Sequence, residues 1–212
     1  MGNCCQLGEI LTKESDRVLY ETDNFFVAPT LGQIDIEGYL LILSKECDRG
    51  IGDIPEKLYK ELEEVIETTR KVIKSEYGLN SRLFEHGPKI CSIRGGGCLD
   101  HAHLHVIPGI DVISDLSLEL MAGLDTIGQL FRTERIDSFK RAGEIYNAQK
   151  NSYMIVESTY GQRVIVDVNF HIPSQYLRRL VADKMGSDKW DWRRFPCEET
   201  MGRTVDRLSG KF

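Results

Sequence analysis

The sequence predicts an α+β fold, and three stretches of the chain support that prediction. Residues 54–77 place apolar side chains at helical spacing with charged residues between them, which is typical of an amphipathic helix. Residues 38–43 are almost continuously apolar, as expected of a strand that is covered on both faces. Residues 101–107 alternate histidine with apolar residues, which is the period of a strand. Helix and strand patterns along one chain indicate the mixed class.

Composition limits the partners that we expect for this chain. Its 212 residues have a formal net charge of -6, so no global basic field attracts nucleic acid. Residues 38–43 form the longest apolar run, far short of the roughly 20 residues that span a bilayer. The N-terminus lacks the pattern of a signal peptide, and the six cysteines are scattered as in reduced proteins. We therefore expect a cytoplasmic protein without a membrane partner.

The predicted elements follow one another without a visible linker or internal repeat. The long helix has Asp53 as its expected cap and Pro55 in its first turn, and it ends at Gly78. A glycine-rich loop at 95–97 precedes the histidine strand. The stretch 132–150 fits neither period. The remaining predicted elements are strands at 18–20, 25–28 and 83–85, a helix at 116–131, a hairpin of 153–157 with 163–168, and a helix after Pro173.

Three of the five histidines form one cluster at His101, His103 and His105. Because strand side chains alternate between faces, the three imidazoles share one face while Ala102 and Leu104 enter the core. Three interpretations are open for such a cluster. It can be a chance grouping, a metal site, since histidine is the commonest metal ligand, or a catalytic site in which a neutral imidazole attacks phosphorus.

The residues around this cluster resemble the signature of the histidine-triad (HIT) superfamily. Residues 96–108 read Gly-Gly-Cys-Leu-Asp-His-Ala-His-Leu-His-Val-Ile-Pro, and upstream Phe26–Pro29 and 38–45 match the family's order of strands. The resemblance covers about the first half of the chain. It implies a HIT-like antiparallel sheet of about five strands packed with helices, a catalytic domain at 1–150, and a C-terminal extension at 151–212 packed on that domain.

The resemblance also implies roles for particular residues. His103 would be the nucleophile and form a nucleotidyl-histidine, a phosphohistidine-type intermediate. His101 and His105 would orient it and bind phosphoryl oxygens, while the backbone at Gly96, Gly97 and Cys98 would hold the phosphate. Water would then release a nucleoside monophosphate. The implied activity is hydrolysis of a nucleotide phosphoanhydride or phosphoramidate, such as a dinucleoside polyphosphate.

The chain departs from the family pattern in ways that keep alternatives open. The glutamine and hydroxyl residues that often precede the triad are absent, and Cys98 stands there instead. Phe84-Glu85-His86-Gly87 is similar to a segment of the galactose-1-phosphate uridylyltransferase branch. Glu85 and His86 are thus candidate substrate-binding residues, although His86 also fits a strand-end residue hydrogen-bonded to a loop. A nucleotidyltransferase or phosphorylase, and a non-catalytic nucleotide-binding module, remain alternatives to hydrolysis.

Cofactor and partner predictions follow from the same resemblance. No metal ligand is assigned and no cofactor is required, and Mg²⁺ would enter only with the nucleotide. A structural Zn²⁺ site on Cys5, Cys47 and His101 is disfavoured because adjacent cysteines rarely chelate one ion. A homodimer is expected by resemblance alone. Nucleic acid is disfavoured as a partner, except through a local patch of four arginines: Arg178, Arg179, Arg193 and Arg194.

Overall fold

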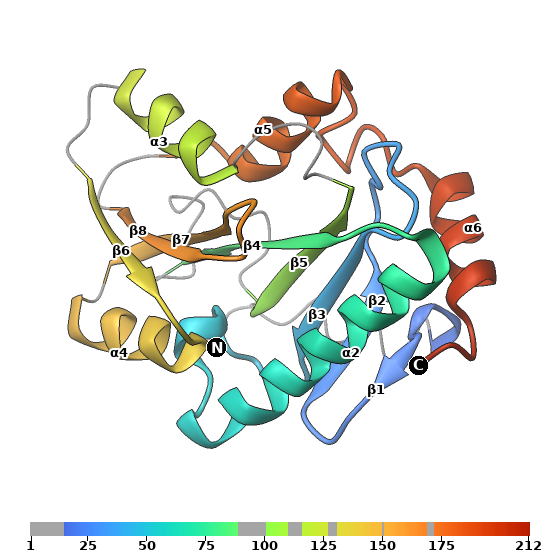
Figure 1. The fold of residues 1–212 in the computed structure, drawn as a ribbon, viewed down its shortest axis with the longest axis horizontal. Coiled ribbons are helices and arrows are strands. Elements are labelled where there is room, and N and C mark those ends of the chain that lie inside the picture. Colours follow the sequence, from blue (N-terminus) through green and yellow to red (C-terminus); the bar gives the residue numbers. More distant parts are fainter. Residues whose placement is uncertain (1–14, 89–100, 110–115, 127–130, 150, 169–171) are drawn as a thin grey trace.

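The computed structural model describes residues 15–88, 101–109, 116–126, 131–149, 151–168 and 172–212. It confirms the α+β class, with one antiparallel sheet in the order β1-β2-β3-β5-β4-β7-β8-β6 (Figure 1). The strands are β1 (Tyr20–Glu21), β2 (Phe25–Pro29), β3 (Leu40–Ser44), β4 (Ser81–Gly87), β5 (His103–Pro108), β6 (Arg132–Ile136), β7 (Ser152–Glu157) and β8 (Arg163–Val168).

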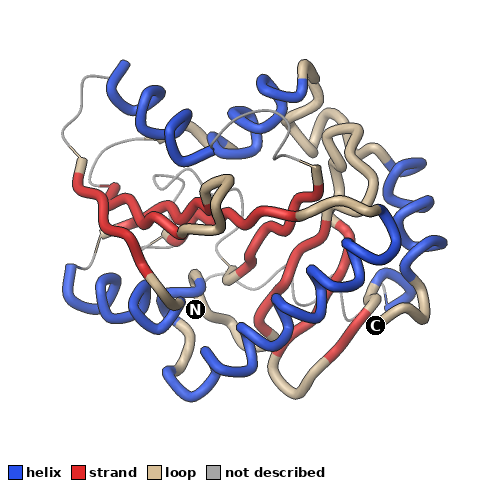
Figure 2. The backbone as a smooth tube through the Cα atoms, viewed as in Figure 1, coloured by secondary structure: helices blue, strands red, loops and turns tan. Residues whose placement is uncertain are grey.

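Helices cover both faces of this sheet. The helices are α2 (Tyr59–Tyr77), α3 (Leu116–Thr126), α4 (Phe139–Gln149), α5 (Tyr176–Met185) and α6 (Glu198–Leu208), with short 3₁₀ helices η1 (Ser15–Arg17), η2 (Ile51–Asp53) and η3 (Glu56–Leu58). Helices α2 and α4 lie on one face and α3 and α5 on the other, as the tube view also shows (Figure 2). Among the described residues, no helix combines the length and apolarity needed to cross a bilayer.

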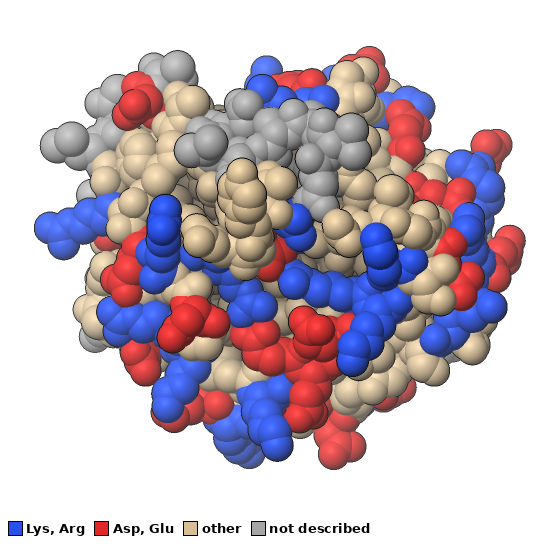
Figure 3. All heavy atoms as spheres, in the orientation of Figure 1, with Lys and Arg blue, Asp and Glu red and all other residues tan. Residues whose placement is uncertain are grey.

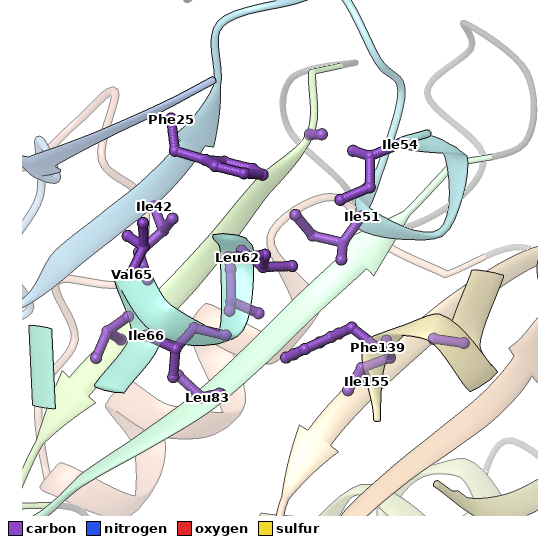
Figure 4. Close-up of a cluster of buried hydrophobic side chains, with 14 of the residues drawn as sticks. Phe25, Ile42, Ile51, Ile54, Leu62, Val65, Ile66, Leu83, Phe139 and Ile155 are labelled. Atoms are coloured by element: carbon purple, nitrogen blue, oxygen red, sulfur yellow. The ribbon is translucent and has the colours of Figure 1, made fainter. Parts of the chain in front are cut away.

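The α2 face of the sheet contains the larger of the two main apolar cores (Figure 4). Leu62 and Ile66 from α2 pack with strand residues such as Ile42 and Leu83, and Phe139 of α4 joins the same cluster. All five side chains are buried. The helical spacing in the sequence therefore marked the contact surface of α2 correctly.

The start of this helix differs from the sequence prediction, whereas its end agrees. The prediction that Asp53 caps a helix beginning at 54 is wrong, because η2 and η3 precede α2 and Leu58 is its N-cap residue. The Asp53 carboxylate instead accepts a hydrogen bond from Arg49 Nε at 2.9 Å. At the other end Gly78 has φ of 69°, a left-handed conformation that glycine adopts without steric cost.

The expectation of about five strands is wrong because the sheet continues past β4. The ambiguous stretch 132–150 forms β6 and α4, and the predicted hairpin of β7 and β8 pairs with the outer edge of β4. Four of the five residues of β6 are exposed, so its sequence lacks the apolar alternation that identifies a strand. Residues 151–212 were expected as an extension packed on the domain. They supply β7 and β8, which are inner strands of the sheet between β4 and β6.

The sheet consists of two topologically equivalent units, although the sequence shows no repeat. The first unit runs β3-α2-β4-β5 and the second β6-α4-β7-β8, and the strand order β3-β5-β4 is followed by its mirror, β7-β8-β6. An approximate two-fold relation therefore exists at the β4–β7 pair. Sequence comparison misses it because α2 has 19 residues and α4 only 11.

The two units differ at the positions of the histidines. Leu43 of β3 pairs with His103, and the corresponding residue of β6, Arg135, pairs with Val164. By the same register His105 corresponds to Val166. Both valines are buried in the cluster that α3 and α5 form on the sheet. The second unit is therefore apolar where the first unit has its imidazoles.

The core predicts a clear difference between two leucine truncations. Leu62→Ala should lower the free energy of unfolding by about 2–5 kcal/mol, because it leaves a cavity under the sheet. Leu79→Ala is the matched control, since Leu79 is 40% exposed and its truncation should cost less than about 1 kcal/mol. Urea unfolding of both variants checks this, and equal losses would contradict the assigned core.

Candidate active site

Strand β5 places the histidines on the face of the sheet opposite α2. Ala102, Leu104 and Val106 are buried in the α2 core, whereas His103 and His105 alternate to the side that faces α5. Each of these two imidazoles is only 4% exposed, and their ring centroids lie 4.9 Å apart in an edge contact. The shared face that the sequence predicted for them is present in the structure.

The hydrogen bond of His103 defines which of its ring nitrogens carries the proton. Nδ1 lies 2.6 Å from the backbone carbonyl oxygen of His101. A carbonyl only accepts hydrogen bonds, so Nδ1 carries the proton and Nε2 keeps its lone pair. Burial lowers the pKa of His103 to about 4, against the opposing effect of this hydrogen bond. His103 is therefore neutral at pH 7, with an unprotonated Nε2 that has no hydrogen-bond partner within the described part of the chain.

His101 contributes through its backbone as well as its ring. Its Nε2 lies 2.7 Å from the carbonyl oxygen of Ser44 and donates to it, which ties the ring to the end of β3. Its Nδ1 is buried and makes no hydrogen bond to the described residues. Burial lowers the pKa of His101 as well. The His101 carbonyl thus holds the ring of His103, and the orienting role expected of the His101 imidazole stays a prediction.

His105 is held by two aromatic neighbours. Its Nδ1 lies 2.7 Å from Tyr39 Oη, and its ring stacks on Phe84 at 4.3 Å between centroids and 10° between planes. Burial lowers the pKa of His105 well below its usual value, and repulsion from Arg178 and from His103 in its protonated form acts in the same direction. Packing and a hydrogen bond therefore both restrain this ring.

His86 lies in β4, the strand beside β5, and joins the same cluster. Its Nε2 accepts a hydrogen bond from the backbone N–H of Leu177 at 3.4 Å, which links the histidine to the first turn of α5. Burial lowers the pKa of His86 to about 3, with a further effect from the charge of His103. His86 is thus hydrogen-bonded near the end of its strand, as one sequence interpretation expected, and it also lies near the other imidazoles as a neutral ring; its substrate-binding role stays a prediction.

Two further residues of the cluster were missed by the sequence analysis. Tyr39 is fully buried and was read as part of an apolar strand. Arg178 was assigned to a surface patch, yet it is only 2% exposed and its Nη1 donates to Tyr39 Oη at 3.3 Å. The one local signal was its position between the apolar Leu177 and Leu180, on the buried side of an amphipathic helix.

The other arginines of the predicted patch lie at the surface. Arg179, Arg193 and Arg194 are exposed, and each guanidinium lies over an aromatic ring. The ring partners are Trp190, Trp192 and Phe195 respectively. Arg178 is thus the one member of the predicted patch that reaches the histidines.

Glu85 lies on the opposite face of the sheet from the histidines. Its Oε1 accepts a hydrogen bond from the backbone N–H of Ile51 at 2.6 Å, and Tyr153 Oη donates to the same carboxyl group at 3.0 Å. Burial raises the pKa of Glu85 to about 8, because the ionised form loses its hydration. The structure therefore does not bring Glu85 together with the other predicted site residues.

Three predicted phosphate-binding residues, Gly96, Gly97 and Cys98, lie outside the described residues. Within the described part no group of three histidine, cysteine or acidic side chains could hold a metal ion. Cys47 is disulfide-bonded, whereas Cys197 is free. The prediction of uniformly reduced cysteines is wrong at this position, and Cys47 in this state has no thiolate to offer zinc.

Comparisons with known proteins give weak likenesses only. No protein-family model matches the chain, and no curated protein matches it. A histidine triad nucleotide-binding protein from Sulfolobus tokodaii is 22% identical over 49% of this chain and 68% of its own, with a TM-score of 0.41. A HIT family hydrolase from Clostridium thermocellum is 22% identical over 51% and 92%, with a TM-score of 0.39. Yeast Ap4A phosphorylase covers 91% of this chain with 76% of its own, at 9% identity and a TM-score of 0.39. At these values the likeness is too weak to decide the activity of this chain.

The buried carboxyl of Glu85 predicts a specific pH dependence of stability. A carboxyl whose pKa is raised on folding stabilises the protein below its ordinary value of 4.5 and loses that contribution as the pH rises to about 8. Buried histidines have the opposite sign and lose stability only below 6.5. Between pH 6.5 and 8 the free energy of unfolding should therefore fall by about 2 kcal/mol because of Glu85.

Glu85→Gln should remove this loss, because the amide does not ionise. Urea unfolding at several pH values measures it, with the exposed Glu134→Gln as the control that should retain the wild-type slope. An unchanged slope in Glu85→Gln would show that Glu85 is already ionised in the folded protein.

Proposed function

We propose that this chain is a histidine-triad enzyme that cleaves nucleotide phosphoanhydrides at the α-phosphorus through a nucleotidyl intermediate on His103. The observation that supports this most directly is the hydrogen bond from His103 Nδ1 to the His101 carbonyl. It leaves Nε2 with a free lone pair, and a neutral imidazole nitrogen is a good nucleophile for phosphorus.

The proposed reaction has two steps. Nε2 of His103 forms a bond to the α-phosphorus while the bond to the leaving phosphate breaks, and its electron pair leaves with that phosphate. The ring becomes a cation, whose Nδ1–H interacts more strongly with the His101 carbonyl at 2.6 Å. Water then attacks the phosphorus, the N–P bond breaks with its electrons returning to Nε2, and a proton passes to solvent. The product is a nucleoside monophosphate.

The protonation state of the cluster favours an anhydride over a phosphoramidate. Burial lowers the pKa of His86 and His103 to about 3 and 4, so both are neutral at pH 7. A neutral imidazole is a poor acid, and an amine leaving group needs a proton whereas a phosphate leaves as a stable anion. The same cluster contains a buried cation, Arg178, which favours anionic ligands.

The face of the molecule that Figure 3 shows gives no support to a polynucleotide substrate. Acidic and basic side chains are interspersed over the face that displays α2 and α4 (Figure 3). The formal net charge is -6, and binding to a nucleic-acid backbone requires concentrated positive charge. A small nucleotide is therefore the proposed substrate, with Mg²⁺ entering as its companion. Association of two copies stays a prediction of the resemblance.

A nucleotide panel tests the proposed nucleophile. His103→Ala should reduce turnover of dinucleoside polyphosphates by at least about 10³-fold, because the covalent route is lost. Rapid quenching followed by intact-mass measurement should show the wild type, and not the variant, heavier by one nucleoside monophosphate less one water. Equal turnover in a variant with wild-type melting behaviour would refute this role.

The acceptor and the leaving group are tested in the same panel. With added inorganic phosphate, a hydrolase should still yield the nucleoside monophosphate, whereas a phosphorylase would yield the diphosphate. At pH 7 phosphoanhydrides should be cleaved at least tenfold faster than phosphoramidates of the same nucleoside. This ratio corresponds to a difference of about 1.4 kcal/mol in activation free energy. Faster cleavage of the phosphoramidate would show that a protonated acid is present in the site.

A further inference from the structure

Arg178 is a buried cation without an acidic partner in the described structure. It is the largest fully buried side chain among the described residues, and all three of its hydrogen bonds go to neutral groups. Nε donates to the Trp190 carbonyl at 3.1 Å, Nη2 to the Gly32 carbonyl at 2.5 Å, and Nη1 to Tyr39 Oη at 3.3 Å. Burial of a charge without an ionic partner costs free energy of folding, so such a residue is a candidate for a functional role.

The third of these hydrogen bonds connects Arg178 to the histidine cluster. Tyr39 Oη accepts from Arg178, and the same oxygen lies 2.7 Å from His105 Nδ1. A hydroxyl that accepts from a guanidinium can still donate its own proton to a neighbouring ring nitrogen. When His105 Nδ1 accepts this proton, the remaining proton of the neutral ring is on Nε2.

We propose that Tyr39 and Arg178 are positioning residues that hold His105 with its proton on Nε2, as a hydrogen-bond donor to a phosphoryl oxygen of the substrate. Nε2 of His105 has no hydrogen-bond partner among the described residues, so it is available to a ligand. The two neighbouring imidazoles then have opposite tautomers. His103 presents a lone pair at Nε2 to phosphorus, and His105 presents an N–H to its oxygen.

The proposal gives α5, a helix that lies outside both units, a part in the site of the first unit. Arg178 belongs to α5, which packs on the apolar face of the second unit, and the Leu177 N–H of the same helix turn binds His86. One turn of α5 thus contacts the cluster at two points. The donor role of His105 rests on the proposed function, whereas its tautomer does not.

The tautomer is tested directly by ¹⁵N NMR of the histidine rings, which needs no substrate. Protein labelled with ¹⁵N-histidine at pH 7 should show His105 with a protonated Nε2, the signals being assigned from a His105→Gln variant. In Tyr39→Phe, which removes only the hydroxyl, His105 should become a mixture of both tautomers. Tyr153→Phe is the matched control, because Tyr153 is an equally buried tyrosine on the opposite face of the sheet. It should leave the His105 signals unchanged.

Kinetics of the same variants test the consequence for the reaction. Tyr39→Phe should lower kcat roughly 100-fold with KM changed less than threefold, since a displaced donor weakens the transition state more than substrate binding. Arg178→Lys should show a smaller loss than Arg178→Met, because it restores the charge without the fork of donors. Arg179→Met, on the exposed neighbour, should behave as the wild type.

The outcomes separate this proposal from the proposed function. An Nδ1-protonated His105 in the wild type, or identical His105 signals in wild type and Tyr39→Phe, would overturn the proposal whatever the activity. If no nucleotide is cleaved by the wild type, the proposed function fails while the NMR result still decides the tautomer. Melting temperatures identify a variant that does not fold. Tyr39→Phe, which keeps the ring and its packing, decides the matter if Arg178→Met is such a variant.

Discussion

The proposed chemistry of this chain depends on one short hydrogen bond at the start of β5, from His103 Nδ1 to the carbonyl oxygen of His101. Burial alone would make the imidazoles neutral but would leave the proton on either nitrogen. The backbone carbonyl removes that ambiguity and holds the ring in one orientation. In the proposed reaction the same carbonyl would face the positively charged ring, so one contact would serve both the resting and the reacting state.

The sheet separates two sets of buried polar groups. On the α5 side are the imidazoles, Tyr39 and Arg178, and on the α2 side Glu85 is bound by Ile51 and Tyr153. Burial acts in opposite directions on the two sets, lowering the pKa of the histidines and raising that of the carboxyl, yet it leaves both neutral near pH 7. Arg178 is the exception, and its charge lies where a phosphate is proposed to bind.

The features predicted correctly from the sequence depend on residues close together in the chain, whereas the features that were missed depend on contacts between distant segments. The alternation of His103 and His105 with apolar residues predicts directly that they share one face of the strand, and Gly78 indicates where α2 ends. Strand β6 was not predicted, because four of its side chains are exposed and its sequence lacks the alternation of apolar and polar residues. Tyr39 lies in an apolar strand and Arg178 in an amphipathic helix, and neither segment contains a pattern that predicts their contact. Glu85 was placed by its neighbours in sequence, although adjacent strand residues face opposite ways.

Tyr39 and Arg178 are 139 positions apart along the chain, and their contact has a consequence for the order of events during synthesis. The three triad histidines leave the ribosome long before the helix that completes their surroundings. A nascent chain that ends before α5 contains the proposed nucleophile but lacks Arg178, whose guanidinium donates a hydrogen bond to Tyr39. The surroundings of His105 are therefore complete only once α5 has been synthesised.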